Sequence, residues 1–253
     1  MIDCHATAVA LRQTAISYAK FPLGSRRREH PLTALEEFAG LEPQRLGPDG
    51  QYALFTFLTY QHGQFGFGAL RRMLPSPVQT HWRIHVVDPR TQHRGIYFVT
   101  NAVTSTPVAL GARMLTEAMP MHVLARAGVT RDADGAVRVS LVPGEGSGPD
   151  CEATLRPAKA PSLEGAWREC WHDYRTFLAY CVPQDRAMSS QPLRRRVSRQ
   201  EIDLGIPLDA CEPMAGEVVS SAARAIAGEA ELMCFRVPAV SFCFAVEAHD
   251  PVR

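Results

Sequence analysis

Arg113 and Glu117 lie four residues apart in a segment with helical character, and His122 follows shortly after Pro120. Residues four apart on a helix share one face. A guanidinium beside a carboxylate could bind a substrate anion and move a proton, and an imidazole can act as a base near neutral pH. The same spacing is also typical of an exposed ion pair, and a histidine there could simply end a strand. The sequence leaves both interpretations open.

A second polar group alternates with apolar side chains along a predicted strand over residues 80–87. His81, Arg83 and His85 share one face of that strand, and the opposite face is apolar. If the polar face points inward, it forms a wall that attracts anions; if it points outward, it is solvated. Positions 81 and 85 are about 13 Å apart along a strand, too far for a shared zinc ion. We expect no metal and no other cofactor.

Three further groups contain residue types that could bind or react, but their spacing is a weaker indication of a site. Cys170 and His172 point roughly 200° apart on a predicted helix, so they are not expected to share a site. Glu247 is a second carboxylate candidate if the strand over residues 240–246 lines a pocket, and otherwise a rim residue. The basic run over residues 194–196, with Arg199, is either a phosphate clamp or a charged loop or edge strand.

The elements that would position these side chains are mostly strands. The Asp-Ala-Asp-Gly sequence over residues 132–135 predicts a hairpin turn. Predicted strands cover residues 52–60, 80–87, 95–101, 123–130, 136–142, 151–156 and 240–246. Predicted helices cover residues 1–19, 33–38 and 162–180, and another begins near Thr106. The pattern favours an α+β fold with a large antiparallel sheet or barrel and a few packed helices.

Composition excludes several classes of function. The net charge is +1, with 27 basic and 26 acidic residues, which argues against nucleic acid or an anionic membrane as a dedicated partner. Seven cysteines without a CxxC pair favour reduced thiols over a disulfide framework. The first 23 residues lack the pattern of a signal peptide, and no apolar run approaches the ~18–20 residues of a membrane span. We therefore expect a cytoplasmic protein.

Three segments together resemble the acetoacetate decarboxylase-like superfamily. They are LRRMLPSPVQTHWRIHV over residues 70–86, GIYFVTN over 95–101 and VALGARMLTEAMP over 108–120. The resemblance implies a cone-like β-barrel with helices outside and a pocket inside, reached near Pro120. It covers most of the chain after about Pro31. We therefore predict an N-terminal extension over residues 1–30 and a single domain over residues 31–253.

In the decarboxylase itself, a lysine directly after that proline forms a Schiff base with the substrate. Here Met121 and His122 follow Pro120, and neither can form an imine. The chain therefore resembles a bacterial branch of the superfamily that lacks this lysine. A Schiff-base lysine must be desolvated or lie beside another cation. Lys20 falls outside the resemblance and Lys159 in a predicted exposed loop, so imine chemistry is not expected.

These observations predict a small-molecule pocket protein. If it is an enzyme, we expect lyase- or isomerase-type acid–base chemistry, without an imine, on a small oxo or carboxylic compound. Glu117 and His122 would then move protons. The residues expected to bind substrate are Arg113, Arg83, His81 and His85.

The alternative is a non-catalytic ligand-binding or accessory protein that kept the barrel and lost the chemistry. It predicts an apolar pocket and a solvent-facing surface at Arg113 and Glu117. The expected partner is a small molecule in either case, and the resemblance also implies self-association as a homo-oligomer.

Overall fold

The computed structural model describes residues 9–22, 40–62, 76–115, 121–146, 148–182, 186–191, 196–203 and 206–251. These residues form one 12-stranded sheet with short helices around it. The strands are β1 (Val9–Pro22), β2 (Glu42–Pro43), β3 (Tyr52–His62), β4 (Val78–Val87), β5 (Arg94–Val103), β6 (Met121–Arg131), β7 (Val137–Pro143), β8 (Cys151–Pro157), β9 (Arg186–Gln191), β10 (Arg196–Asp203), β11 (Glu212–Val219) and β12 (Leu232–Pro251). The helices are α2 (Thr106–Leu115), α3 (Gly165–Cys170), α4 (Tyr174–Cys181) and α5 (Ser221–Ala227), with a 3₁₀ turn η5 (Leu208–Ala210).

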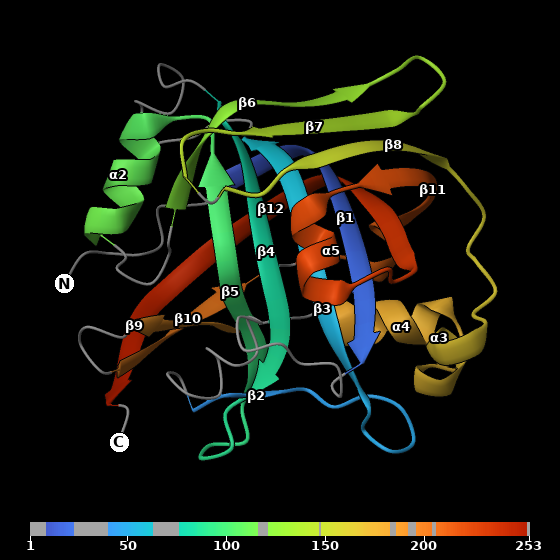
Figure 1. Cartoon of the computed structure of the whole chain (residues 1–253), viewed down its shortest axis with the longest axis horizontal. Helices are drawn as coiled ribbons and strands as arrows, with labels where there is room; N and C mark the ends of the chain where they lie inside the picture. The colour runs from blue at the N-terminus through green and yellow to red at the C-terminus, as the bar shows by residue number, and fades with distance from the viewer. Residues whose placement is uncertain are drawn as a thin grey trace.

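The sheet curls and closes on itself in two places. Its strand order is β10-β9-β5-β6-β7-β8-β11-β12-β1-β3-β4-β2, and β5 also pairs with β4 while β10 pairs with β12. In Figure 1, β6, β7 and β8 cross above the upright central strands, and α3 and α4 lie at the lower right. Closure of this kind satisfies strand edges that would otherwise be exposed. The predicted α+β fold with a curled sheet is confirmed.

Both faces of the central strands are covered by a hydrophobic cluster. On one face Trp82 of β4 stacks on Phe57 of β3, with ring centroids 4.7 Å apart, and the cluster extends to Ile226 of α5. On the other face, Phe98 of β5 belongs to a cluster that includes Phe177 of α4. A side chain on either face of β4 is therefore removed from water.

The helix predicted for residues 1–19 is wrong over its described part. Residues Val9–Pro22 form β1, which lies between β12 and β3 and pairs antiparallel with both. The prediction relied on Ile2, Val9 and Ile16, whose seven-residue spacing is helical, but pairing with two neighbouring strands overrides so weak a local signal. The extension predicted for residues 1–30 thus contributes a strand to the sheet.

The single helix predicted for residues 162–180 is two helices, α3 and α4. The chain turns extended at Trp171 and resumes its helix at Tyr174, because Asp173 caps the new helix and accepts a hydrogen bond from the Thr176 amide at 2.8 Å. Apolar residues continue at helical spacing across the break, since both helices bury their aromatic faces in one cluster. Periodicity alone therefore did not reveal the break.

The remaining predictions of elements agree with the structure where it describes them. The strands predicted over residues 52–60, 80–87, 95–101, 151–156 and 240–246 fall in β3, β4, β5, β8 and β12, and the predicted hairpin is β6–β7. The helix predicted near Thr106 is α2. The helix predicted for residues 33–38 lies outside the described residues. Within the described part of the chain, no helix has the length and apolar character to cross a membrane.

Candidate functional site

The polar residues of β4 are buried. His81, Arg83 and His85 are 7%, 9% and 0% exposed, so the interpretation of a solvated strand face is wrong. Strand pairing brings polar side chains from β3 and β5 onto the same face. We call this group the polar face; it consists of Thr56, Tyr60 and His62 of β3, Gln79, His81, Arg83 and His85 of β4, and Asn101 of β5.

Hydrogen bonds connect most of the polar face into one chain. The Tyr60 hydroxyl and the Gln79 amide both donate to Nε2 of His81, at 2.6 and 3.0 Å. His62 Nε2 donates to Oε1 of Gln79 at 2.7 Å. Because two donors meet at Nε2, the His81 proton resides on Nδ1, which donates to Oδ1 of Asn101. His81 is therefore held in one tautomer.

The imidazoles of the polar face are held neutral. Burial, and then the positive charge of Arg83, lower the pKa of His81 and of His85 to about 3. Burial also lowers the pKa of His62 and raises that of Tyr60. Arg83 therefore contributes positive charge beside two neutral imidazoles, and positive charge attracts anions.

This arrangement predicts acid sensitivity. Between the unfolded pKa of about 6.5 and the folded value, the unfolded chain binds protons that the folded chain does not, so stability falls as pH drops below about 6.5. His81 and His85 should each contribute a loss of roughly 2 kcal/mol at pH 5. Urea unfolding near pH 7.5 and near pH 5 measures this loss of stability. The His85→Gln variant should lack the part of the loss that His85 contributes, whereas a variant that loses as much stability as the parent would contradict this account. His172→Gln, in an exposed position, is the control.

A β-bulge in β5 brings Asn101 onto the polar face. His81 pairs with Asn101 and Trp82 with Thr100, but Arg83 pairs with Phe98, so β5 carries one extra residue. The extra residue reverses the alternation of β5, and both Asn101 and Phe98 then lie on the side of His81 and Arg83. Bulges re-aim side chains in this way, often beside active sites. Simple alternation would put Asn101 on the opposite face from Phe98, which is why sequence reasoning missed it.

Arg113 and His122 lie at a different position from the polar face. Arg113 is exposed on α2, and its Nε donates to the Met121 carbonyl at 2.8 Å. His122 is partly buried, and burial followed by Arg113 lowers its pKa. In the parallel pairing of β5 and β6, Met121 lies opposite Asn101 and His122 opposite Ala102. Met121, 2% exposed, therefore faces the same side as Asn101, and His122 faces the other side.

None of the other candidate residues from the sequence is among the residues that define the polar face. Glu117 and residues 192–195 lie outside the described residues, and the Glu247 side chain is not described. Arg199 is partly buried, 3.8 Å from the buried carboxylate of Asp88. His172 is exposed and Cys170 only partly so. No group of three or more metal-binding side chains occurs among the residues that the structure describes.

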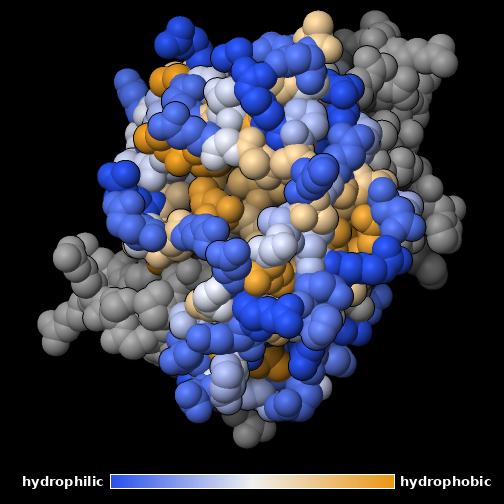
Figure 2. All heavy atoms as spheres, turned by 90° about the vertical axis from the view of Figure 1, so that its right-hand side faces the viewer, coloured by the Kyte–Doolittle hydropathy of each residue, from blue (hydrophilic) through white to orange (hydrophobic). Residues whose placement is uncertain are grey.

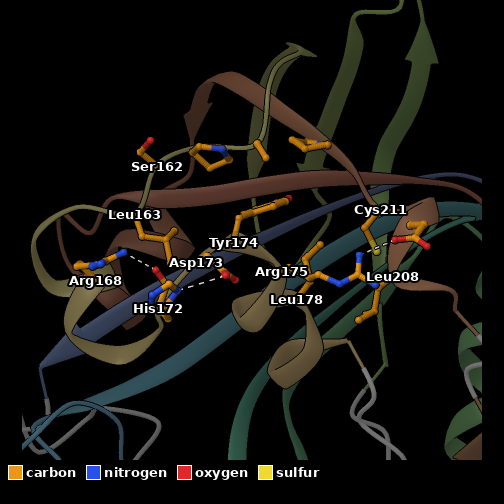
Figure 3. A pocket seen from close by; sticks show the side chains of 14 residues that line it. Ser162, Leu163, Arg168, His172, Asp173, Tyr174, Arg175, Leu178, Leu208 and Cys211 are labelled. Carbon is orange, nitrogen blue, oxygen red and sulfur yellow. Dashed lines mark hydrogen bonds and ion pairs between the residues drawn. The ribbon is translucent and has the colours of Figure 1, made fainter.

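A surface pocket of about 560 Å³, unforeseen from the sequence, lies between α3, α4 and η5 (Figure 3). Figure 2 shows the side of the molecule that carries these helices; its surface is hollowed, with apolar residues in the hollow and hydrophilic ones around it. Two of the arginines at the pocket have partners there: Arg175 forms an ion pair with Asp209 at 2.8 Å, and Arg168 donates to the backbone carbonyl of His172. Such exposed pairs contribute little energy and leave few groups for a ligand.

The curled sheet with short helices around it is an acetoacetate decarboxylase-like fold, and three of the solved structures that share it are similar over most of their length. The enduracididine biosynthesis enzyme MppR superposes with a TM-score of 0.54 at 12% identity, covering 96% of this chain and 87% of that one. Acetoacetate decarboxylase from Legionella pneumophila gives 0.53 at 10%, covering 96% and 88%. An acetoacetate decarboxylase-like enzyme from Sphingomonas wittichii RW1 gives 0.50 at 11%, covering 96% and 91%.

These similarities confirm the predicted fold. No protein-family model matches the chain, and no curated protein matches it in sequence. At these low identities the likeness concerns the fold alone, so the function has to be argued from the residues of this chain.

Proposed function

We propose that this protein binds a small oxo or carboxylic acid at the polar face and acts on it, if it is an enzyme, without an imine. The observation that carries the proposal is the burial of Arg83 between two imidazoles kept neutral. A buried guanidinium can donate two hydrogen bonds to one carboxylate. The polar face is a better candidate than the surface pocket, because its guanidinium is buried whereas the charged groups of the pocket are exposed.

The chemistry that the polar face supports is stabilisation of negative charge on oxygen. A guanidinium and uncharged donors near a carbonyl stabilise the enolate that forms when a neighbouring bond to carbon breaks. This is consistent with a lyase- or isomerase-type reaction. One of the similar structures, MppR, was solved in complex with pyruvate, which supports a short oxo acid as the first ligand to test. The proton-transfer roles of Glu117 and His122 stay predictions.

The register of the strands supports a mechanism without an imine. The resemblance places the lysine of the decarboxylase directly after Pro120, and here that position is Met121, buried beside Asn101. The chain has two lysines. Lys159 is exposed, and Lys20 lies in β1 opposite Leu54. Lys159 therefore lacks the burial that a desolvated Schiff-base lysine needs.

We expect borohydride treatment in the presence of pyruvate or acetoacetate to leave the mass of the intact protein unchanged, because a trapped imine requires a neutral amine near the ligand. The measurement is intact-protein mass spectrometry, with Lys20→Arg and Lys159→Arg variants to locate any adduct. An adduct that disappears in Lys20→Arg would show that another lysine has replaced the missing one, and the imine-independent mechanism would be abandoned.

Native mass spectrometry of the purified protein tests the ligand class. Retention of a carboxylate supports the proposal. Retention of a neutral, lipid-like molecule would favour the non-catalytic binding protein, and the exposure of Arg113 agrees with that alternative. The burial of charged and polar groups on β4 does not agree with it, because the alternative predicts an apolar pocket.

We further propose a cytoplasmic homo-oligomer without nucleic-acid or membrane partners. Light scattering would determine its oligomeric state.

A further inference from the structure

The side chain of Asn101 is fully buried, and only one of its two polar groups has a hydrogen-bond partner among the described residues. Its Oδ1 accepts the hydrogen bond from His81 Nδ1. Its Nδ2 has no acceptor among the residues that the structure describes. A buried N–H group without an acceptor is costly, and native proteins seldom keep one without a reason. The β-bulge that brings Asn101 onto the polar face is an independent indication that this side chain has a role there.

The orientation of the Asn101 amide is set by the hydrogen-bond chain. Tyr60 and Gln79 donate to Nε2 of His81, so Nδ1 carries the proton and requires an acceptor. If the amide rotated by half a turn, its NH₂ group would meet this N–H. The Oδ1 atom must therefore face His81, and the two Nδ2 hydrogens point elsewhere.

We propose that Nδ2 of Asn101 binds the oxo oxygen of the ligand, with His81 as a positioning residue. This inference rests on the proposed function and assigns a role to Asn101 for those ligands that carry an oxo oxygen. Asn101 pairs with His81, and Arg83 follows two residues along β4, about 7 Å away along the strand. In the proposed complex the carboxylate of the ligand lies at Arg83 and its oxo oxygen at Asn101, on the same face of the sheet. Met121, beside Asn101, provides an apolar surface for the carbon chain.

The test compares pyruvate with propionate, which has a carboxylate but no oxo oxygen, by isothermal titration calorimetry. The parent protein should bind pyruvate more tightly than propionate. Asn101→Leu, which keeps the side-chain size and removes the donor, should weaken pyruvate binding about tenfold and change propionate binding less than about twofold. Such a split distinguishes a direct contact from a loss of packing, which would weaken both ligands.

The outcomes separate this inference from the proposed function. If the parent binds neither acid, the proposed function fails. If the parent prefers pyruvate and Asn101→Leu preserves that preference, the role of Asn101 is overturned and the binding function stands. If the variant does not fold, nitrogen NMR of His81 in the parent decides. A proton on Nδ1 is expected, whereas a proton on Nε2 would turn the Asn101 oxygen toward the ligand and overturn the inference.

Discussion

Arg83→Met is expected to weaken binding of pyruvate by about 10- to 100-fold, the effect of losing a hydrogen-bonded charge pair of about 1.5–3 kcal/mol. Methionine retains much of the arginine stem but removes the charge. The loss should affect every carboxylate, because in the proposed complex the guanidinium binds the acid group and not the rest of the ligand. The same change removes one of the causes that lower the pKa of His81 and of His85, so both pKa values should rise.

The matched control is Arg113→Met, which removes a guanidinium from the exposed surface of α2. Calorimetry should show its affinity within about twofold of the parent, since charges in water contribute little to binding. The two variants separate the hypothesis based on sequence spacing from the one based on burial. If Arg113→Met loses the ligand and Arg83→Met retains it, the site lies at α2 and the polar face is structural.

Trp82→Ala is expected to produce the largest loss of stability, about 3–5 kcal/mol, the range typical of buried tryptophans. Trp82 is fully buried, stacks on Phe57 and contacts Phe55 at 5.7 Å between ring centroids. Its indole N–H also donates to Thr80 Oγ1. The melting temperature should fall by roughly 2–4 °C for each kcal/mol in a domain of this size.

Calorimetric melting and urea titration both measure this loss, and Leu110→Ala serves as the control because Leu110 is an exposed apolar residue on α2. The control should change stability by less than about 0.5 kcal/mol. A Trp82→Ala loss of similar size would mean that the cluster around β3 and β4 collapses into the cavity. The two-core description of the sheet would then be incorrect.

The alternation of polar and apolar residues in β4 could be predicted from the sequence, but the burial of its polar face could not. A strand with polar residues on one side looks the same whether that side meets water or other polar side chains. Burial of His81 and His85 depends on Tyr60, Asn101 and the covering cluster, which come from other strands and helices. The sequence therefore predicted the strand, whereas the tertiary structure determined whether its polar face is buried.

The errors share the same origin. The helix predicted over residues 1–19 and the unbroken helix over 162–180 both followed local spacing, whereas pairing partners and a cap determined the outcome. Asn101 was missed because one extra residue in β5 reverses the alternation. The emphasis on Arg113 came from helical spacing, and the structure shows that its Nε donates to the start of β6.

The pairing of β1 with β12 has a consequence for synthesis of the protein. Val9–Ala19 lies against Leu232–Phe242, so the blue and red strands of Figure 1 are neighbours although nearly the whole chain separates them. On the ribosome, β1 can pair early with β3, but its other edge must wait for β12. At about 5–20 residues per second, that wait lasts on the order of ten seconds or more. During translation this open edge is the place where a nascent chain would recruit a chaperone or a neighbouring chain.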